Sequence, residues 1–336
     1  MTLKIGIIGT GVMGGDHARR VATGVSGARV VAVSDPDTGR AERVAGAAGG
    51  ARVHADGLAL VGDAEVEAVL VASPPDTHEA YALACVAAGK PVLCEKPLAP
   101  TAGACLRVVE AEAAAGGGRL VQVGFMRRYD EGYLSVKSAL DGGLLGRPLL
   151  VHCVHRNAGV GPGFTGGTII LDSVVHEIDA ARWLLGQEIA AATVLAPRRS
   201  ALAPEGLDDP QLVLLETGAG VLVDVEIFVS CQYGYDVRCE VVGERGTVSL
   251  PEPAEALVRR QGLRARRVSG DWRRRFAGAY RGELQAWVDG AARGGIAGPS
   301  AWDGYAATAA AQACMAAVDA RRRTTVELAP RPGLYA

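Results

Sequence analysis

The sequence predicts an α/β protein with two domains, a doubly wound parallel sheet followed by an α+β domain with a large open, mostly antiparallel sheet. In the first 124 residues, short runs rich in Val and Ile alternate with Ala-rich stretches of helical length, which is typical of a parallel sheet with helices on both faces. From residue 125 onwards, several segments alternate polar and apolar residues, which indicates a sheet with one packed face. The length of 336 residues fits two domains of roughly 100–200 residues, and we place them at 1–124 and 125–336.

The elements of the first domain follow from its apolar runs. These runs are continuous, as expected for parallel strands that are buried on both faces. We expect strands at Leu3–Ile8, Arg29–Ser34, Ala68–Ala72, Pro91–Glu95 and Leu120–Gly124. We expect helices between them, near 12–23, 38–48, 77–89 and 101–116.

The second domain combines helices with alternating strands. We expect helices at Tyr129–Leu140, Asp172–Leu185, 283–293 and 302–320. We expect strands at Pro148–Arg156, Ile189–Ala196, Gln211–Glu216, Val221–Ser230, Val237–Val242 and Thr247–Leu250, with Gly218–Gly220 as a hairpin turn. In the strand Val221–Ser230 the valines and isoleucine share one face, whereas Leu222 and Phe228 lie on the other. These two apolar residues indicate that two copies of the sheet pack together in a homo-oligomer.

Composition excludes several classes of protein. With 49% hydrophobic and 21% charged residues, the chain is neither disordered nor fibrous, and no apolar run approaches the ~18 residues of a membrane span. Seven cysteines without a C-x-x-C pair indicate reduced thiols and no zinc site, and with no signal peptide at the N-terminus we expect a cytoplasmic protein. A net charge of −2 argues against nucleic-acid binding, so we interpret the arginine-rich segment 259–275 as solvated or inter-subunit.

A glycine-rich turn predicts a dinucleotide site. Gly9-Thr10-Gly11-Val12-Met13-Gly14 follows the first expected strand and opens a helix, which is the context that gives G-x-G-x-x-G its meaning. The first glycine allows a tight turn, the second admits a pyrophosphate, and the third permits close packing of helix and strand. We therefore expect Gly9, Gly11, Val12, Met13 and Gly14 to bind the cofactor.

Two further loops are expected to line the same cofactor. Asp35 ends the second strand, where a carboxylate either accepts hydrogen bonds from the adenosine ribose or caps a helix; its charge repels a 2′-phosphate and favours NAD over NADP, although Arg40 could soften this preference. Ser73 and Pro74 follow another strand end, and ligands of such sheets bind at the carboxyl ends of the strands. His78 either touches the cofactor or lies on the surface of the next helix.

Three side chains are candidates for proton chemistry. Glu95 and Lys96 end another strand at the same rim, and we expect both to lie against the cofactor. Lys96, held extended before Pro97, either stabilises an oxyanion beside a nicotinamide or is an ordinary surface lysine. Asp172, His176 and Asp179 follow the spacing i, i+4, i+7 and would share one helical face. That arrangement suits a histidine general base oriented by a carboxylate, or equally a buried structural histidine.

Together these motifs resemble the Gfo/Idh/MocA oxidoreductase family. The resemblance rests on Gly9–Gly14, Glu95-Lys96-Pro97, Gly124–Asp130 and Asp172-x-x-x-His176-Glu177-x-Asp179, with further matches at Val154–Asn157, Tyr233–Asp236, Cys239–Gly243 and Asp271-Trp272. These segments span nearly the whole chain, and they most resemble the members that oxidise inositol.

The resemblance implies a Rossmann domain, NAD as cofactor, a homotetramer and a catalytic trio of Lys96, Asp172 and His176. It also implies a polyol pocket lined by Arg127, His155, Asn157, Asp179 and Tyr235, together with the trio. His176 would take the proton from a ring hydroxyl, and Lys96 would stabilise the oxyanion as hydride passes to nicotinamide C4. Lys96 and His176 must then converge over one dinucleotide ring.

Two alternatives remain open. The chain could oxidise another cyclitol, an aminocyclitol or a hexose, because only the pocket loops separate these activities. It could also be a non-catalytic NAD-sensing regulator, although such a sensor has no need of a proton acceptor.

Overall fold

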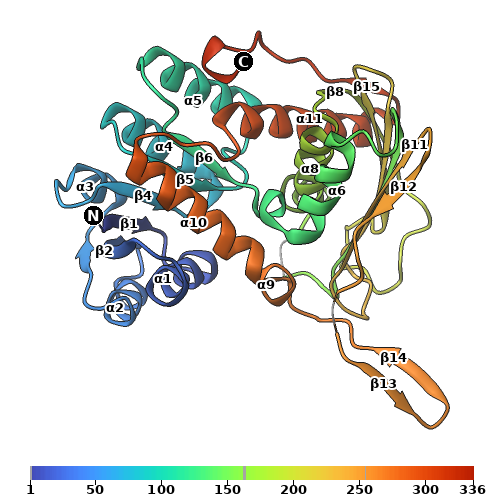
Figure 1. The fold of residues 1–336 in the computed structure, drawn as a ribbon, viewed down its shortest axis with the longest axis horizontal. Coiled ribbons are helices and arrows are strands. Elements are labelled where there is room, and N and C mark those ends of the chain that lie inside the picture. Colours follow the sequence, from blue (N-terminus) through green and yellow to red (C-terminus); the bar gives the residue numbers. More distant parts are fainter. Residues whose placement is uncertain (1, 162–163, 254) are drawn as a thin grey trace. The chain divides into compact units, whose positions relative to one another are not determined.

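The computed structural model describes residues 2–161, 164–253 and 255–336, which form two compact units (Figure 1). The first unit extends to Met126 and also includes Tyr280–Thr308 and Leu328–Ala336. The second unit comprises Arg127–Ala279 and Ala309–Glu327. The chain therefore returns twice to the first unit after leaving it. The predicted domain bounds, 1–124 and 125–336, divide the chain only once and stay a prediction.

The first unit contains the expected parallel sheet. Its six strands run in the order β3-β2-β1-β4-β5-β6, the doubly wound order in which the direction of winding reverses between β1 and β4. The strands are β1 (Leu3–Ile8), β2 (Ala28–Ser34), β3 (Arg52–His54), β4 (Ala68–Val71), β5 (Val92–Glu95) and β6 (Val121–Gly124). The helices between them are α1 (Val12–Gly24), α2 (Thr38–Ala47), α3 (Gly57–Gly62), α4 (His78–Ala87) and α5 (Ala102–Ala114).

One strand of this sheet and one helix of the first unit were not expected from the sequence. Strand β3 has three residues, two of them exposed, at the sheet edge, and helix α3 has only six residues. Neither is long enough to show an apolar period, so the pattern that predicts the other elements is absent here.

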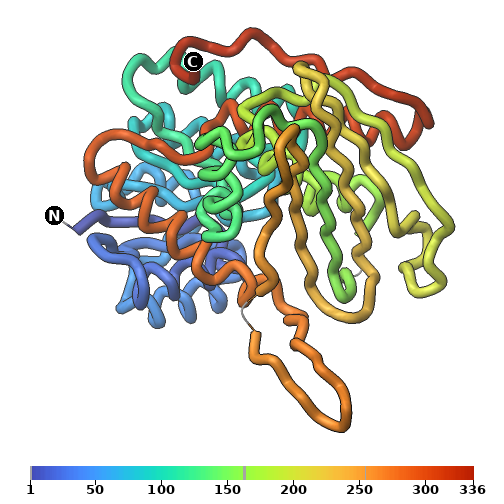
Figure 2. Tube along the Cα trace, turned by 45° about the vertical axis from the view of Figure 1, so that its right-hand side comes forward, coloured from blue at the N-terminus to red at the C-terminus, as the bar shows by residue number. Residues whose placement is uncertain are grey.

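The core of the first unit joins both ends of the chain. Ile5, Ile7 and Leu70 from the central strands are fully buried, and Trp287 from α10 (Ala277–Arg293) belongs to the same apolar cluster. Figure 2 traces this late helix, in orange, alongside the blue N-terminal segments. A helix that begins 269 residues after the end of β1 thus completes the core of the N-terminal sheet.

The second unit contains a seven-stranded open sheet in the order β12-β11-β7-β10-β9-β8-β15. All neighbouring strands are antiparallel except β7 and β10, which are parallel. The strands are β7 (Pro148–Arg156), β8 (Ile189–Leu195), β9 (Gln211–Thr217), β10 (Leu222–Phe228), β11 (Asp236–Gly243), β12 (Gly246–Ser249) and β15 (Thr324–Thr325). The prediction of a large, mostly antiparallel sheet is confirmed.

One face of this sheet is packed, and the other is open. Val223, Val225 and Ile227 are completely buried on the inner face, whereas Leu222 is 49% exposed on the outer face. Helices α6 (Glu131–Asp141) and α8 (Val175–Leu185) lie on the inner side, as Figure 1 shows. The alternation read from the sequence therefore assigns the two faces correctly.

A projecting hairpin was also not expected. Strands β13 (Leu257–Arg260) and β14 (Leu263–Arg266) pair only with each other and extend away from the large sheet (Figure 1). Gln261 and Gly262 both have positive φ, at 50° and 78°, which is the conformation of a type I′ turn. The remaining helices are α7 (Gly166–Thr168), α9 (Trp272–Arg275) and α11 (Ala301–Ala320), with short 3-10 turns at Pro75–Thr77, Met126–Tyr129 and Gly333–Tyr335.

The helix expected at Asp172–Leu185 begins earlier in the structure and contains a π-helical turn. Helical structure begins at Gly166, and Ile169–Val174 form a π-helical turn before α8 starts at Val175. The expected spacing i, i+4, i+7 assumed the α-helical period throughout, and Asp172 lies in the π turn, where that period does not hold. The prediction that Asp172, His176 and Asp179 follow one regular α-helical face is therefore wrong at Asp172.

Candidate functional site

The glycine turn occupies the point where the winding of the sheet reverses. Gly9 follows β1 with φ of +86°, and a Cβ atom there would lie 2.5 Å from the backbone nitrogen of Ser73 after β4. A Cβ atom on Gly14 would lie 1.8 Å from the carbonyl oxygen of Gly9. Both positions exclude any side chain, so the loops after β1 and β4 approach each other as a dinucleotide cradle requires.

The first turn of α1 is open to an anion. Its N-cap, Gly11, provides no side-chain hydrogen bond, and Val12 is 66% exposed. A Cβ atom on Gly11 would meet nothing nearer than the Arg40 side chain at 3.7 Å. The N–H groups of this turn can therefore bind a pyrophosphate, and the cradle fits NAD.

Asp35 is held in place by the glycine turn itself. Its carboxylate accepts hydrogen bonds from the Thr10 backbone N–H at 2.7 Å, the Thr10 hydroxyl at 3.0 Å and the Asp37 N–H at 2.8 Å. Burial raises the pKa of Asp35, but these hydrogen bonds outweigh it, so the pKa lies below its usual value. A carboxylate offers about four acceptor positions, which leaves capacity for a ribose hydroxyl. Nη2 of Arg40 lies 3.5 Å from Oδ1 of Asp35.

The loop after β4 is tied to the segment that carries Lys96. The Ser73 and Thr77 hydroxyls are hydrogen-bonded at 2.7 Å, next to Pro74. His78 is buried, and its two ring nitrogens each lie 2.8 Å from a carbonyl oxygen, one of Ser73 and the other of Pro97. Burial lowers the pKa of His78, and the two carbonyls partly offset this effect. His78 therefore links two loops of the cofactor site, and both its nitrogens are engaged by protein.

Glu95 faces inward from the end of β5. Its carboxylate lies 2.6 Å from Nε2 of the buried His17 on α1 and accepts a hydrogen bond from the Lys96 N–H at 3.3 Å. A Cβ atom on Gly124 would lie 2.8 Å from the same carboxylate. Glu95 thus anchors the strand end that presents Lys96, and a direct contact between Glu95 and the cofactor stays a prediction.

The second unit carries the other half of the predicted trio. Asp172 is exposed in the π turn, and His176 is buried in the first turn of α8. Asp179, one turn further along, is buried and forms a bidentate ion pair with Arg128, with Nε at 3.0 Å. The structure thus brings Asp172, His176 and Asp179 onto one continuous helical segment.

Beside them lies a buried cluster of polar side chains. Arg127, Glu177 and His155 come from the 3-10 turn after β6, from α8 and from β7, and each is at most 3% exposed. The Arg127 guanidinium donates to the Glu177 carboxylate, and Nδ1 of His155 lies 3.1 Å from that carboxylate. Burial raises the pKa of Glu177, but the charge of Arg127 and the contact with His155 outweigh it, so Glu177 is ionised at neutral pH.

Aromatic rings enclose this cluster. The guanidinium of Arg127 lies 5.9 Å from the ring centre of Tyr133 and 5.7 Å from that of Phe276. Tyr235 packs edge-to-face on His155 at 5.6 Å, and burial raises the pKa of Tyr235 to about 12, so it remains a hydroxyl donor at neutral pH. Asn157 continues β7, and its backbone bonds to Phe228 and Cys231. Arg127, His155 and Tyr235 therefore form one polar group, and their role in binding a polyol stays a prediction.

The predicted residues thus form two groups. The cofactor residues and Lys96 belong to the first unit, and Asp172, His176 and the polyol residues belong to the second. The convergence of Lys96 and His176 over one nicotinamide ring stays a prediction.

Sequence reasoning missed the supporting residues Thr10, His17 and Glu177. Only Glu177 left a signal, because a carboxylate between the apolar residues Val175 and Ile178 of a helix requires a partner.

Among the described residues, no group of three or more His, Cys, Asp or Glu side chains is arranged to hold a metal ion. No helix in the same parts of the chain combines the length and apolar character needed to cross a membrane.

Comparison with known families matches both parts of the chain. Residues 3–125 match the model described as an oxidoreductase family with an NAD-binding Rossmann fold, and residues 137–328 match the C-terminal alpha/beta domain of the same family. These matches cover more than half of the chain.

Several relatives are similar over their full length. Inositol 2-dehydrogenase 2 of Saccharopolyspora erythraea is 58% identical over 336 residues, which cover 100% of this chain and 99% of the relative. Inositol 2-dehydrogenase of Burkholderia cenocepacia is 50% identical with the same coverage.

Among solved structures, the myo-inositol dehydrogenase of Lactobacillus casei in complex with NAD(H) and myo-inositol aligns with a TM-score of 0.97 at 37% identity, covering 100% of both chains. The scyllo-inositol dehydrogenase of the same organism, with bound NAD(H) and scyllo-inositol, aligns with a TM-score of 0.89 at 26% identity, covering 97% of this chain and 99% of the other.

The charge of Asp35 should decide between NAD and NADP. In Asp35→Asn the acceptor for the ribose is weakened and the repulsion of a 2′-phosphate is lost, so the ratio of kcat/KM for NAD to that for NADP should fall at least about tenfold, or roughly 1.4 kcal/mol. Steady-state kinetics with both cofactors measures this ratio. Asp37→Asn, which changes a neighbouring half-exposed carboxylate, is the control. An unchanged ratio in Asp35→Asn would contradict the assignment.

Proposed function

Because the chain belongs to the Gfo/Idh/MocA oxidoreductase family, we propose that it is an NAD-dependent inositol 2-dehydrogenase. Its reaction is the oxidation of one ring secondary hydroxyl of myo-inositol to the ketone, 2-keto-myo-inositol (scyllo-inosose). The observation that carries this proposal is the 58% identity to an inositol 2-dehydrogenase over the entire chain. The glycine cradle, the open first turn of α1 and the ionised Asp35 support NAD as the cofactor.

The proposed chemistry divides among three side chains. His176 takes the proton from the hydroxyl, Asp172 orients the imidazole, and the Lys96 ammonium stabilises the developing oxyanion. NAD, when bound, supplies the acceptor for the hydride. Glu95 accepts a hydrogen bond from the backbone N–H of Lys96, and His78 contacts the carbonyl of Pro97. These contacts hold the backbone that carries the ammonium, which supports this role because a catalytic group must be positioned before the reaction.

Stereochemical selectivity is assigned to the polar group of the second unit. Arg127, His155 and Tyr235 share one buried cluster, and Asn157 and Asp179 lie on the adjoining strand and helix. Side chains that read adjacent hydroxyls discriminate isomers, because the wrong isomer leaves a buried polar group without its partner.

The runner-up substrate is scyllo-inositol. The observation that favours it is the structural likeness to a scyllo-inositol dehydrogenase, which is weaker both in identity and in TM-score than the likeness to the myo-inositol enzyme. Other cyclitols, aminocyclitols or hexoses, and an NAD-sensing role without turnover, are the remaining alternatives.

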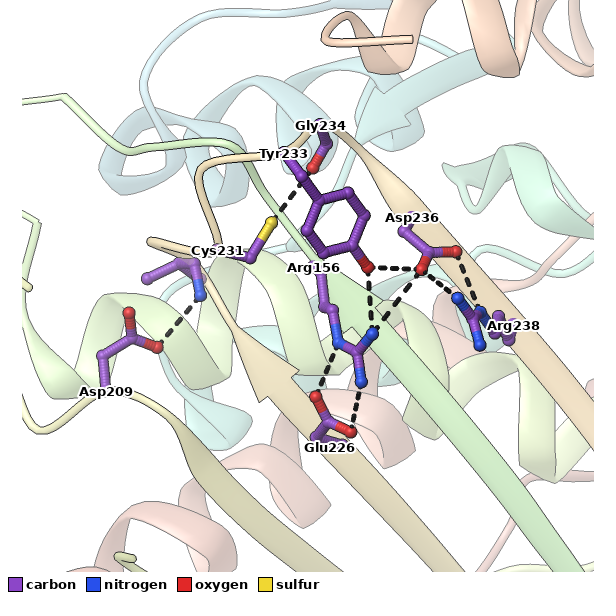
Figure 3. Close-up of polar contacts among 9 residues, drawn as sticks. Arg156, Asp209, Glu226, Cys231, Tyr233, Gly234, Asp236 and Arg238 are labelled. Carbon is purple, nitrogen blue, oxygen red and sulfur yellow. Dashed lines mark hydrogen bonds and ion pairs between the residues drawn. The ribbon is translucent and has the colours of Figure 1, made fainter. Parts of the chain in front are cut away.

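The open face of the large sheet is proposed as the contact between copies in a homotetramer. Leu150 and Leu222 lie opposite each other on β7 and β10, 36% and 49% exposed. Further along the same strands and on β11, charged side chains form pairs: Arg156 binds Glu226 at 2.6 and 2.7 Å, and the Tyr233 hydroxyl and Arg238 bind Asp236 (Figure 3). When the charged side chains of a sheet face are already paired, a second subunit can bury that face without leaving an unpaired charge in the interface.

A cytoplasmic location is also proposed. All seven cysteines are unpaired, and six of them are buried. Burial raises the pKa of Cys85 and Cys314 to about 12, which keeps them as unreactive thiols. Unpaired thiols fit a reducing compartment.

A substrate panel tests the proposed activity. NADH formation at alkaline pH should be fastest with myo-inositol, slower with scyllo- and D-chiro-inositol and slowest with glucose, because hydroxyl-reading side chains penalise the wrong isomer. Absorbance of NADH is the measurement. The highest kcat/KM for scyllo-inositol would favour the runner-up, and tight NAD binding without any turnover would favour a sensor.

Removal of either proton-handling side chain should abolish turnover. Lys96→Ala and His176→Ala should each lower kcat by at least about a hundredfold, the usual contribution of a positioned acid, base or oxyanion donor. Calorimetry should show NAD affinity within about twofold of wild type, since neither side chain forms the cradle. Near-wild-type turnover in either variant would remove the assigned roles.

Disruption of the open sheet face should dissociate the protein. Leu222→Glu places an unpaired charge opposite Leu150, so light scattering after gel filtration should show a mass below that of the tetramer. Leu58→Glu, an equally exposed leucine on α3 of the first unit, is the control and should leave the mass unchanged. A tetramer in Leu222→Glu would contradict this interface.

A further inference from the structure

The buried Glu177 has a task that the proposed mechanism does not use. We propose that Glu177 is a positioning residue, which fixes the His155 ring in the tautomer protonated on Nδ1 and thereby presents Nε2 as a hydrogen-bond acceptor for a substrate hydroxyl. This inference rests on the proposed function, which places His155 at the polyol. It concerns how one substrate contact is built, and it adds no step to the oxidation.

The first support is the geometry at Nδ1. A neutral imidazole carries one proton, and the partner of each nitrogen decides where the proton resides. Nδ1 of His155 lies 3.1 Å from a carboxylate oxygen of Glu177. A carboxylate only accepts hydrogen bonds, so a proton on Nδ1 gives a charge-assisted bond, whereas a bare Nδ1 would place two lone pairs against each other.

Arg127 competes for the same nitrogen. Its Nη2 lies 3.3 Å from Nδ1 of His155, a longer distance than that to the carboxylate. Arg127 also donates from Nη1 to Glu177, so the guanidinium has a stronger acceptor than the ring. Both Arg127 and His155 can therefore donate to Glu177, and the carboxylate serves as their common acceptor.

The second support is burial. The side chains of Glu177 and Arg127 are each 1% exposed, and that of His155 is 4% exposed, so water cannot replace a missing partner. The three side chains come from a helix, a 3-10 turn and a strand, and the edge-to-face packing of Tyr235 also holds the ring. These contacts restrict rotation of the ring. Glu177 is then the acceptor that holds the ring proton on Nδ1.

The remaining ring nitrogen faces no hydrogen-bond partner among residues 2–161, 164–253 and 255–336. Both hydrogen-bond contacts that His155 makes with these residues involve Nδ1. With the proton on Nδ1, Nε2 accepts a hydrogen bond and cannot donate one. A hydroxyl group of the polyol can donate to it, whereas a carbonyl oxygen of the ketone product cannot, so this contact would favour the alcohol over the ketone at that position.

Nitrogen NMR tests the tautomer without any turnover. In protein labelled with ¹⁵N-histidine, the ring nitrogens of His155 are assigned by the loss of their signals in His155→Gln. We expect a bare Nε2 and a protonated Nδ1 in the wild type. In Glu177→Ala, Arg127 becomes the only partner of Nδ1, so the proton should move to Nε2; in Glu177→Gln, the amide oxygen still accepts, and Nδ1–H should persist.

Kinetics supplies the second readout. Glu177→Ala should raise KM for myo-inositol at least about tenfold, the cost of one polar contact, with KM for NAD within about twofold of wild type. Glu177→Gln should recover most of this loss. Glu188→Gln removes a different carboxylate, which pairs with Arg182 of the same helix at 2.6 and 2.9 Å, and should change neither the tautomer nor the KM for myo-inositol.

The outcomes separate this inference from the proposed function. A proton on Nε2 in the wild type, or an unchanged tautomer or KM for myo-inositol in Glu177→Ala, overturns the role of Glu177 even if the enzyme oxidises inositol. Failure of the wild type to oxidise any inositol overturns the proposed function, whatever the tautomer is. Should Glu177→Ala not fold, the wild-type spectrum decides, because it reports the tautomer directly.

Discussion

A carboxylate shielded from water must be paired, and the pairing of Glu177 holds the second unit together around its polar residues. Arg127 and His155 reach the carboxylate from two other elements, and aromatic rings close over them. Removal of one partner from such a set is costly, since it leaves an uncompensated charge in the interior. The same interactions that stabilise this part of the fold therefore give the proposed substrate residues Arg127 and His155 fixed positions.

A related constraint shapes the cofactor cradle in the first unit. The loops after β1 and β4 approach so closely that Gly9 admits no side chain, Gly14 packs directly on the carbonyl of Gly9, and Thr10 holds Asp35. His78 then connects the loop of Ser73 with the backbone of Pro97, next to Lys96. Cofactor preference and the placement of the proposed catalytic ammonium thus depend on one continuous set of backbone contacts at the rim of a parallel sheet.

Expectations from local pattern agree well with the structure. The apolar runs of β1, β2 and β4 and the alternation in β10 all predict the observed strands, because the burial of a strand determines which of its consecutive residues are apolar. The exceptions include elements without such a pattern: the short strand β3 and helix α3, the exposed arginine-rich hairpin, and the π turn that carries Asp172.

By itself the sequence determined the fold class, the glycine turn with its acidic partner Asp35, and the residue types of the candidate site, because each depends on residues close together in the chain. Only the tertiary structure decided that Glu95 pairs with His17, that Glu177 unites Arg127 with His155, and that Trp287 completes the N-terminal core. Each of these contacts joins residues that are far apart in sequence, and periodicity along the chain carries no information about which distant side chain will meet a buried charge.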